Sequence, residues 1–172
     1  MYKANQKHIQ PLLISNVNDL PEGQRRRLEN SWAGVFYREF FCRIREDSFA
    51  VLYADVPSRP NIPVNVLLGL ETLKAGYGWS DEELYDHFCF DLQVRYALGY
   101  RDLHEGGFEL RTLYNFRRYL SKYNQEHGVN LVAQAFEDIT DQQMVALKVQ
   151  ASIQRMDSTQ IASNILDMSR LQ

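Results

Sequence analysis

Helical periodicity is the feature that most constrains what this chain folds into. Apolar and aromatic side chains recur at steps of three and four residues, the spacing that places them on one face of a helix. The longest such stretch, residues 22–53, is predicted to be helical throughout. Its periodic side chains are Leu28, Trp32, Val35, Phe36, Phe40 and Ile44. We interpret this stripe as core packing, which favours a mainly α domain.

Proline, glycine and capping residues divide the following part of the chain into further helices. Pro63 suits the first turn of a helix that is expected to run to about Ala75, before glycines end it. Shorter and longer helices are expected at residues 92–98, 109–127 and 131–138. The buried stripe expected for the helix after Pro63 is Val66, Leu67, Leu70 and Leu73.

The turn at residues 76–78 is a candidate helix-turn-helix corner, because a short glycine-containing turn joins two helices there. The second helix opens with Ser80-Asp81-Glu82-Glu83, a capping box in the S-x-x-E form. Capping accounts for these acids, so we expect no catalytic role for them. An acidic helix is also poorly suited to enter a DNA groove.

The end of the chain changes pattern. Val145, Leu147, Val149 and Ile153 alternate as residues of a strand do. We therefore predict a helical domain over residues 1–147, with the helix-turn-helix-like corner, followed by a short β segment over residues 148–172.

Composition narrows the function classes. The 172 residues carry a formal net charge of −3, which argues mildly against a nucleic-acid partner unless the basic residues cluster. We find no apolar run long enough for a membrane span and no signal peptide, so a cytoplasmic protein is expected. Cys42 and Cys89 lie far apart and are predicted to be reduced core residues. The scattered histidines give no metal-ligand spacing.

Basic residues do cluster on the helix predicted at 109–127. Arg111, Asn115, Arg118 and Lys122 are spaced to share one face. Such side chains contact phosphates and base edges, although a solvated basic face has the same pattern. The candidate DNA-binding residues are Arg111, Tyr114, Asn115, Arg117, Arg118 and Lys122, together with Arg25, Arg26 and Arg27.

Asp157 lies in an Asp157-Ser158-Thr159 segment of the predicted β region. An aspartate on a strand can present its carboxylate to a divalent cation, but two-metal chemistry needs two or three such carboxylates. By pattern alone this segment is typical of a turn or a strand end.

Five segments of the sequence, in this order along the chain, resemble segments of a known protein family. They are residues 58–67, Trp79-Ser80-Asp81-Glu82-Glu83-Leu84, Tyr96-Ala97-Leu98-Gly99-Tyr100, Arg111-Thr112-Leu113-Tyr114-Asn115-Phe116-Arg117 and residues 154–165 around Asp157. Together they resemble the amino-terminal half of DDE-type transposases of bacterial insertion sequences, in the InsH-like branch. The resemblance runs from about Leu28 to Leu171.

This resemblance implies a helical amino-terminal domain followed by the start of an RNase H-like catalytic domain that binds Mg²⁺ and cuts and rejoins DNA. Asp157 matches the first catalytic carboxylate and metal ligand of the family. The second aspartate and the glutamate of the family have no counterpart in these 172 residues. The chain alone is therefore expected to hold no metal and to be inactive, with double-stranded DNA of the transposon ends as its partner.

Two other functions stay open at this point. The helices could form a module for dimerisation or another interaction, with the basic residues as solvated surface and a homodimer as the product. Alternatively, the chain could be a truncated regulator that binds DNA without catalysis.

Overall fold

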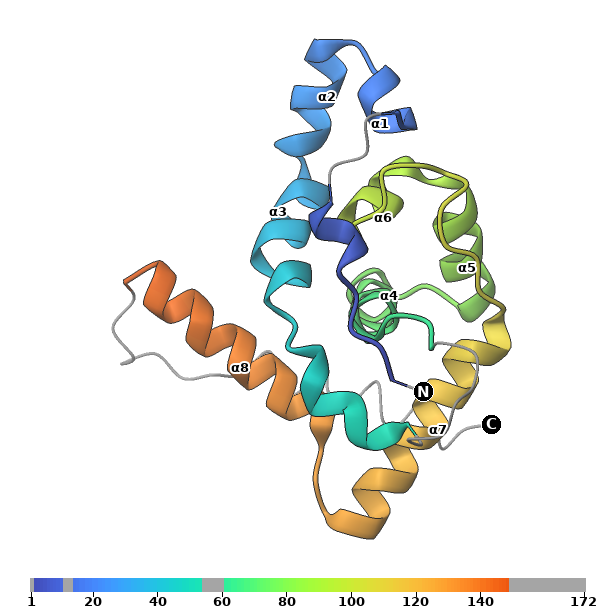
Figure 1. The fold of residues 1–172 in the computed structure, drawn as a ribbon, viewed down its shortest axis with the longest axis vertical. Coiled ribbons are helices and arrows are strands. Elements are labelled where there is room, and N and C mark those ends of the chain that lie inside the picture. The colour runs from blue at the N-terminus through green and yellow to red at the C-terminus, as the bar shows by residue number, and fades with distance from the viewer. Residues whose placement is uncertain (1, 11–13, 54–60, 149–172) are drawn as a thin grey trace.

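Helix α4 (Val64–Tyr77) lies at the centre of the molecule and is seen end-on in Figure 1, with the other helices around it. The computed structural model describes residues 2–10, 14–53 and 61–148. Within these ranges all regular structure is helical, with no strand. Besides α4, the elements are η1 (Lys7–Ile9), α1 (Asn16–Asp19), α2 (Glu22–Glu29), α3 (Trp32–Glu39), η2 (Phe41–Arg43), η3 (Glu46–Leu52), α5 (Asp81–Phe90), α6 (Leu92–Ala97), α7 (Leu110–His127) and α8 (Leu131–Ala146), where η denotes a 3-10 helix. The mainly α prediction is confirmed.

Burial of α4 extends around nearly the whole helix. The predicted stripe is buried, and so are residues on the remaining faces, such as Val64 and Leu68 at 0% exposure. A helix that is apolar all round belongs in a core, because each face needs a partner. The helix ends at Tyr77, two residues later than expected, and is capped by Gly78, whose φ of 71° is the left-handed conformation that favours glycine.

A buried glutamate closes the amino-terminal end of α4. Pro63 offers no side-chain cap there, and Glu46 of η3 accepts hydrogen bonds from the backbone N–H groups of Val64 and Asn65 at 3.0 and 3.3 Å. Its other oxygen accepts the N–H of Asn5 at 2.8 Å. Burial raises the pKa of Glu46, and these backbone donors oppose the shift. The carboxylate therefore joins η3, α4 and the N-terminal segment.

The prediction of one continuous helix over residues 22–53 was wrong. The chain turns between α2 and α3, where Ser31 caps α3 by accepting the N–H of Ala33 at 3.2 Å. The turn is tight at Gly34, because an added Cβ would lie 1.9 Å from the carbonyl oxygen of Glu29. After α3 the chain continues as the short 3-10 helices η2 and η3.

Capping residues set the ends of α5 and α6 as the sequence predicted. Ser80 and Glu83 form the capping box of α5, with their reciprocal hydrogen bonds at 3.1 and 2.7 Å. Asp91 caps α6 by accepting the N–H groups of Gln93 and Val94.

The strand expected to begin near Val145 is not observed there, because α8 continues to Ala146. Gln142 and Gln143 donate side-chain hydrogen bonds to the carbonyl oxygens of Arg43 and Glu39, and these bonds hold α8 against η2 and the end of α3. The β segment and RNase H-like start predicted for residues 148–172 lie almost wholly outside the described residues, which end at 148.

Both cysteines carry free thiols, but Cys42 is exposed, so its assignment to the core was wrong. No helix in the described part of the chain combines the length and apolarity needed to cross a membrane.

Candidate nucleic-acid interface

Helix α7 presents two different faces along its 18 residues. Leu113, Phe116 and Leu120 are at most 3% exposed and fix the inner face against the core. Gly128 ends the helix in the left-handed conformation, with a φ of 66°. Since the inner residues recur every three or four positions, the residues on the opposite side of the helix are directed outward.

The outward face is basic. The structure brings Arg111, Arg118 and Lys122 together on it as exposed side chains, with Asn115 half-buried between them. Arg111 and Arg118 form no ion pair with any described acid, and the Arg118 guanidinium lies 5.4 Å from the ring centre of Tyr119. Lys122 lies 3.7 Å from Glu126 in an exposed pair, which contributes little to stability. We call the set Arg111, Asn115, Arg118 and Lys122 the α7 basic row.

A shallow hollow of about 440 Å³ borders the basic row. Ser121 and Gln125, which the sequence prediction missed, add polar groups to it. The same helical spacing would have found them, since each lies three residues beyond a member of the row. The full lining is Tyr114, Asn115, Arg117, Arg118, Ser121, Lys122 and Gln125.

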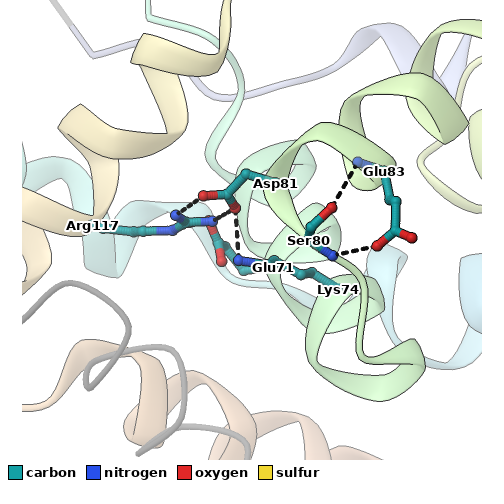
Figure 2. A network of polar contacts seen from close by, with 6 residues as sticks. All are labelled: Glu71, Lys74, Ser80, Asp81, Glu83 and Arg117. Atoms are coloured by element: carbon teal, nitrogen blue, oxygen red, sulfur yellow. Dashed lines mark hydrogen bonds and ion pairs between the residues drawn. The ribbon is translucent and has the colours of Figure 1, made fainter. Parts of the chain in front are cut away.

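Arg117 does not belong to the outward row. It is 3% exposed, and its guanidinium binds two carboxylates inside the molecule, as Figure 2 shows. Its Nε donates to Oε1 of Glu71 at 2.7 Å, and its Nη1 and Nη2 donate to Asp81 at 2.8 and 2.5 Å. Because these donors already bind carboxylates inside the protein, Arg117 is not available for contact with DNA.

Lys74 completes this group, with its Nζ 2.7 Å from Asp81 Oδ1. We call Glu71, Lys74, Asp81 and Arg117 the buried ion network; it joins α4, the start of α5 and α7 (Figure 2). The two acids balance the two bases. The network therefore holds α7 in place, and none of its acids pairs with Arg111 or Arg118 of the outward row.

The pKa values follow from these contacts. Hydrogen bonds from Arg117 lower the pKa of Asp81 to about 2, although burial opposes the shift. For Glu71, burial raises the pKa and contact with Arg117 only partly offsets it. Burial disfavours the charged form of Arg117, but its bonds to Asp81 and Glu71 outweigh this and raise its pKa.

The sequence held a signal for this network. Arg117 lies four residues after Leu113 and three before Leu120, so it shares the side of α7 that faces the core. Glu71 is a single acid within the apolar run of α4 and is 0% exposed. Asp81 was attributed to helix capping alone, which was incomplete, since it also binds Arg117 and Lys74.

The three arginines of α2 lie elsewhere. In Figure 1, α2 is at one end of the long axis and α7 extends to the other. Arg26 forms an ion pair with Glu22, and Arg25 approaches Glu29 at 4.0 Å. Arg27 is exposed. These residues therefore form no continuous surface with the α7 basic row.

The corner between α4 and α5 has the expected short turn but no basic face. Trp79 stacks between the rings of Tyr77 and His87, with centroids 4.6 and 4.1 Å away, and so closes the corner. On α5, Glu82 and Asp86 are exposed acids. Since α4 is buried and α5 is acidic, the outward face of α7 is the better candidate for contact with a polyanion.

The predicted metal ligand Asp157 lies outside the described residues. Within the described ranges, no three His, Cys, Asp or Glu side chains group as metal ligands would.

Comparison of the chain with protein-family models, with curated proteins and with solved structures found no match.

Proposed function

We propose that this chain is the DNA-binding, amino-terminal part of an insertion-sequence transposase, and that the α7 basic row contacts the ends of the element. The observation that carries the DNA contact is the row itself. Its three exposed cations lie on one helix face, and neither arginine is neutralised by a described acid. The ordered segments that resemble the transposase family support the assignment to transposition.

The dimensions of α7 suit the major groove of DNA. Arg111 and Lys122 are eleven residues apart, which is about 16 Å along a helix. The major groove is about 12 Å wide, so cations at this separation reach phosphates on both of its sides. Asn115 and Arg118 then lie between them, and these residue types bind adenine and guanine edges.

Catalysis is assigned to the longer enzyme that the resemblance implies. There, Asp157 would be the first of three carboxylates that hold Mg²⁺, and the metal would supply the activation of the attacking oxygen. By this proposal the 172-residue chain binds double-stranded DNA and does not cut it.

Binding can be measured by fluorescence anisotropy with a labelled 30-base-pair duplex taken from the end of the element. Two phosphate contacts, from Arg111 and Lys122, predict that the logarithm of the affinity falls with the logarithm of salt concentration with a slope of about −2. Replacing Arg111, Arg118 and Lys122 together by glutamine should remove most of the binding at about 50 mM salt.

The matched control replaces Arg25, Arg26 and Arg27 by glutamine. It removes an equal number of positive charges, but from α2. We expect this control to retain affinity close to that of the parent. Equal losses in the two variants would show a general charge effect and would contradict the role of α7. If neither the parent nor the control binds DNA while light scattering detects a dimer, the interaction-module alternative replaces this proposal.

A further inference from the structure

A second cationic surface lies away from the α7 row, in a groove of about 790 Å³. One wall is the N-terminal segment, which crosses the molecule in front of α4 (Figure 1), and the other is the loop after α6. Lys3, Lys7 and Arg101 line it, and Glu105 is the one acid among its described lining residues. Since the chain as a whole carries a net charge of −3, this local excess of positive charge is a distinct feature. We infer that this groove binds phosphate groups.

The cations of the groove are available to a ligand. Lys3 and Lys7 are exposed, and neither forms an ion pair with a described acid. The groove's acid is directed to the backbone, because the Glu105 carboxylate accepts the N–H of Arg101 at 2.8 Å. The two lysine ammonium groups are therefore not paired with any acid among the described residues.

Arg101 is held in position without being neutralised. Its guanidinium lies 4.1 Å from the ring centre of Tyr96 and 4.7 Å from that of Tyr37. Its Nη1 makes only long contacts, 3.5 and 3.4 Å, with the carbonyl oxygens of Tyr96 and Tyr100. A guanidinium fixed by aromatic rings loses little freedom when it binds an oxyanion, and its fork of donors matches phosphate geometry.

The groove is formed before any ligand arrives, because its N-terminal wall is tied down. The Lys3 N–H donates to Asn61 Oδ1 at 2.8 Å, and the Tyr37 hydroxyl donates to the His8 carbonyl oxygen at 3.0 Å. Gly99 permits the close approach of the two walls, since a Cβ there would lie 2.8 Å from the Cβ of His8. A preformed site avoids much of the entropic cost of ordering its residues on binding.

The chemistry fixes the class of ligand but leaves two sources for it. Inorganic phosphate fits within the volume, and a stretch of nucleic-acid backbone presents the same oxygens along an open groove. The groove shares none of its lining with the hollow beside α7, so this inference stands apart from the proposed function.

The test compares Lys3→Gln/Lys7→Gln with a control, Arg45→Gln/Lys148→Gln. The control removes the same charge from exposed residues that line neither surface. In one arm, inorganic phosphate is titrated into labelled protein while the amide signals of Lys7, Gly99 and Arg101 are followed by NMR. In the other arm, binding of a 30-base-pair duplex is measured as a function of salt.

For phosphate as ligand, the groove amides shift saturably in the parent and the control, and Lys3→Gln/Lys7→Gln weakens the affinity roughly tenfold. For a DNA backbone as ligand, the same variant reduces the salt slope for the duplex by about 2, one for each lost phosphate contact. Either result supports the groove as a phosphate site and identifies the source. If the variant matches the control in both arms, the inference is overturned. The triple glutamine variant at Arg111, Arg118 and Lys122 tests the proposed function separately. We expect it to weaken duplex binding and to leave the phosphate titration unaltered.

Discussion

Arg117 of α7 and Asp81 of α5 form a bidentate pair, in which two guanidinium nitrogens donate to the two carboxylate oxygens at 2.8 and 2.5 Å. The pair joins residues 36 positions apart in the sequence and lies beneath the exposed row of the same helix. The next residue, Arg118, is directed to solvent. The two adjacent arginines therefore differ in role: Arg117 joins two helices inside the protein, and Arg118 contributes positive charge to the surface.

The first prediction concerns these two arginines. Replacing Arg117 by methionine leaves the buried Glu71 without its partner and Asp81 with Lys74 alone. Breaking a buried pair in this way costs roughly 3–5 kcal/mol of unfolding free energy. Arg118→Met, at an exposed position, should change it by less than about 0.5 kcal/mol. Urea unfolding followed by circular dichroism measures both. A loss below about 0.5 kcal/mol in Arg117→Met as well would show that the buried network adds no stability.

The second prediction is a loss of stability in acid that depends on Asp81. Its pKa is about 2 in the folded chain against an ordinary value of 3.8. The unfolded chain therefore takes up the proton first, and stability falls as the pH drops from about 4 to 2, by about 2 kcal/mol. Glu71 acts in the opposite direction, since burial raises its pKa.

Unfolding free energies at pH 5 and pH 2.5 test this dependence. Asp81→Asn should be less stable than the parent at pH 5 but should lose less on acidification, because its side chain cannot titrate. A decline as steep as that of the parent would assign the acid sensitivity to other carboxylates.

The third prediction concerns the cap of α5. Ser80→Ala removes the oxygen that accepts the Glu83 N–H at 3.1 Å, and such a loss typically costs about 1 kcal/mol. Ser80→Asp keeps an acceptor at this position and should recover most of the loss. Ser121→Ala, outside any cap, is the control and should stay within about 0.5 kcal/mol of the parent. Thermal unfolding of the four proteins side by side gives the comparison.

The fourth prediction uses two glycines in neighbouring helices. A Cβ at Gly34 meets the Glu29 carbonyl at 1.9 Å, so Gly34→Ala forces the α2–α3 turn apart and should cost about 1–3 kcal/mol. Gly23 in α2 has no neighbouring atom within 4 Å of such a Cβ. Gly23→Ala should therefore stabilise the protein by about 0.5–1 kcal/mol through helix propensity. In denaturant unfolding, Gly34→Ala should lower the midpoint concentration and Gly23→Ala should raise it.

Local signals predicted much of this fold. The capping box at Ser80, the cap at Asp91 and the left-handed glycines at 78 and 128 each act within a few residues, so their effect can be predicted from the sequence directly. The turn at Ser31 was missed because the apolar stripe continues through it. Periodicity reports which side is buried and does not report whether the helix axis turns.

The candidate interface was predicted in part for a related reason. Helical spacing placed Arg111, Arg118 and Lys122 together, and the structure has them on one face. Spacing also puts Arg117 on the core-facing side, but it did not identify the partners Glu71 and Asp81, because they lie 46 and 36 residues away. Pairing over such distances depends on how the helices pack, which the sequence pattern does not encode.

The carboxylate of Glu46 has a consequence for how any phosphate is recognised. The free N–H groups at the start of a helix are a common place for an anion to bind, and in α4 this place is already taken by the protein's own acid. The anion binding that we propose for the α7 row and for the groove uses side chains instead. Side chains can be substituted one at a time. Single substitutions of the cations named above should therefore measure how much each contributes to the affinity.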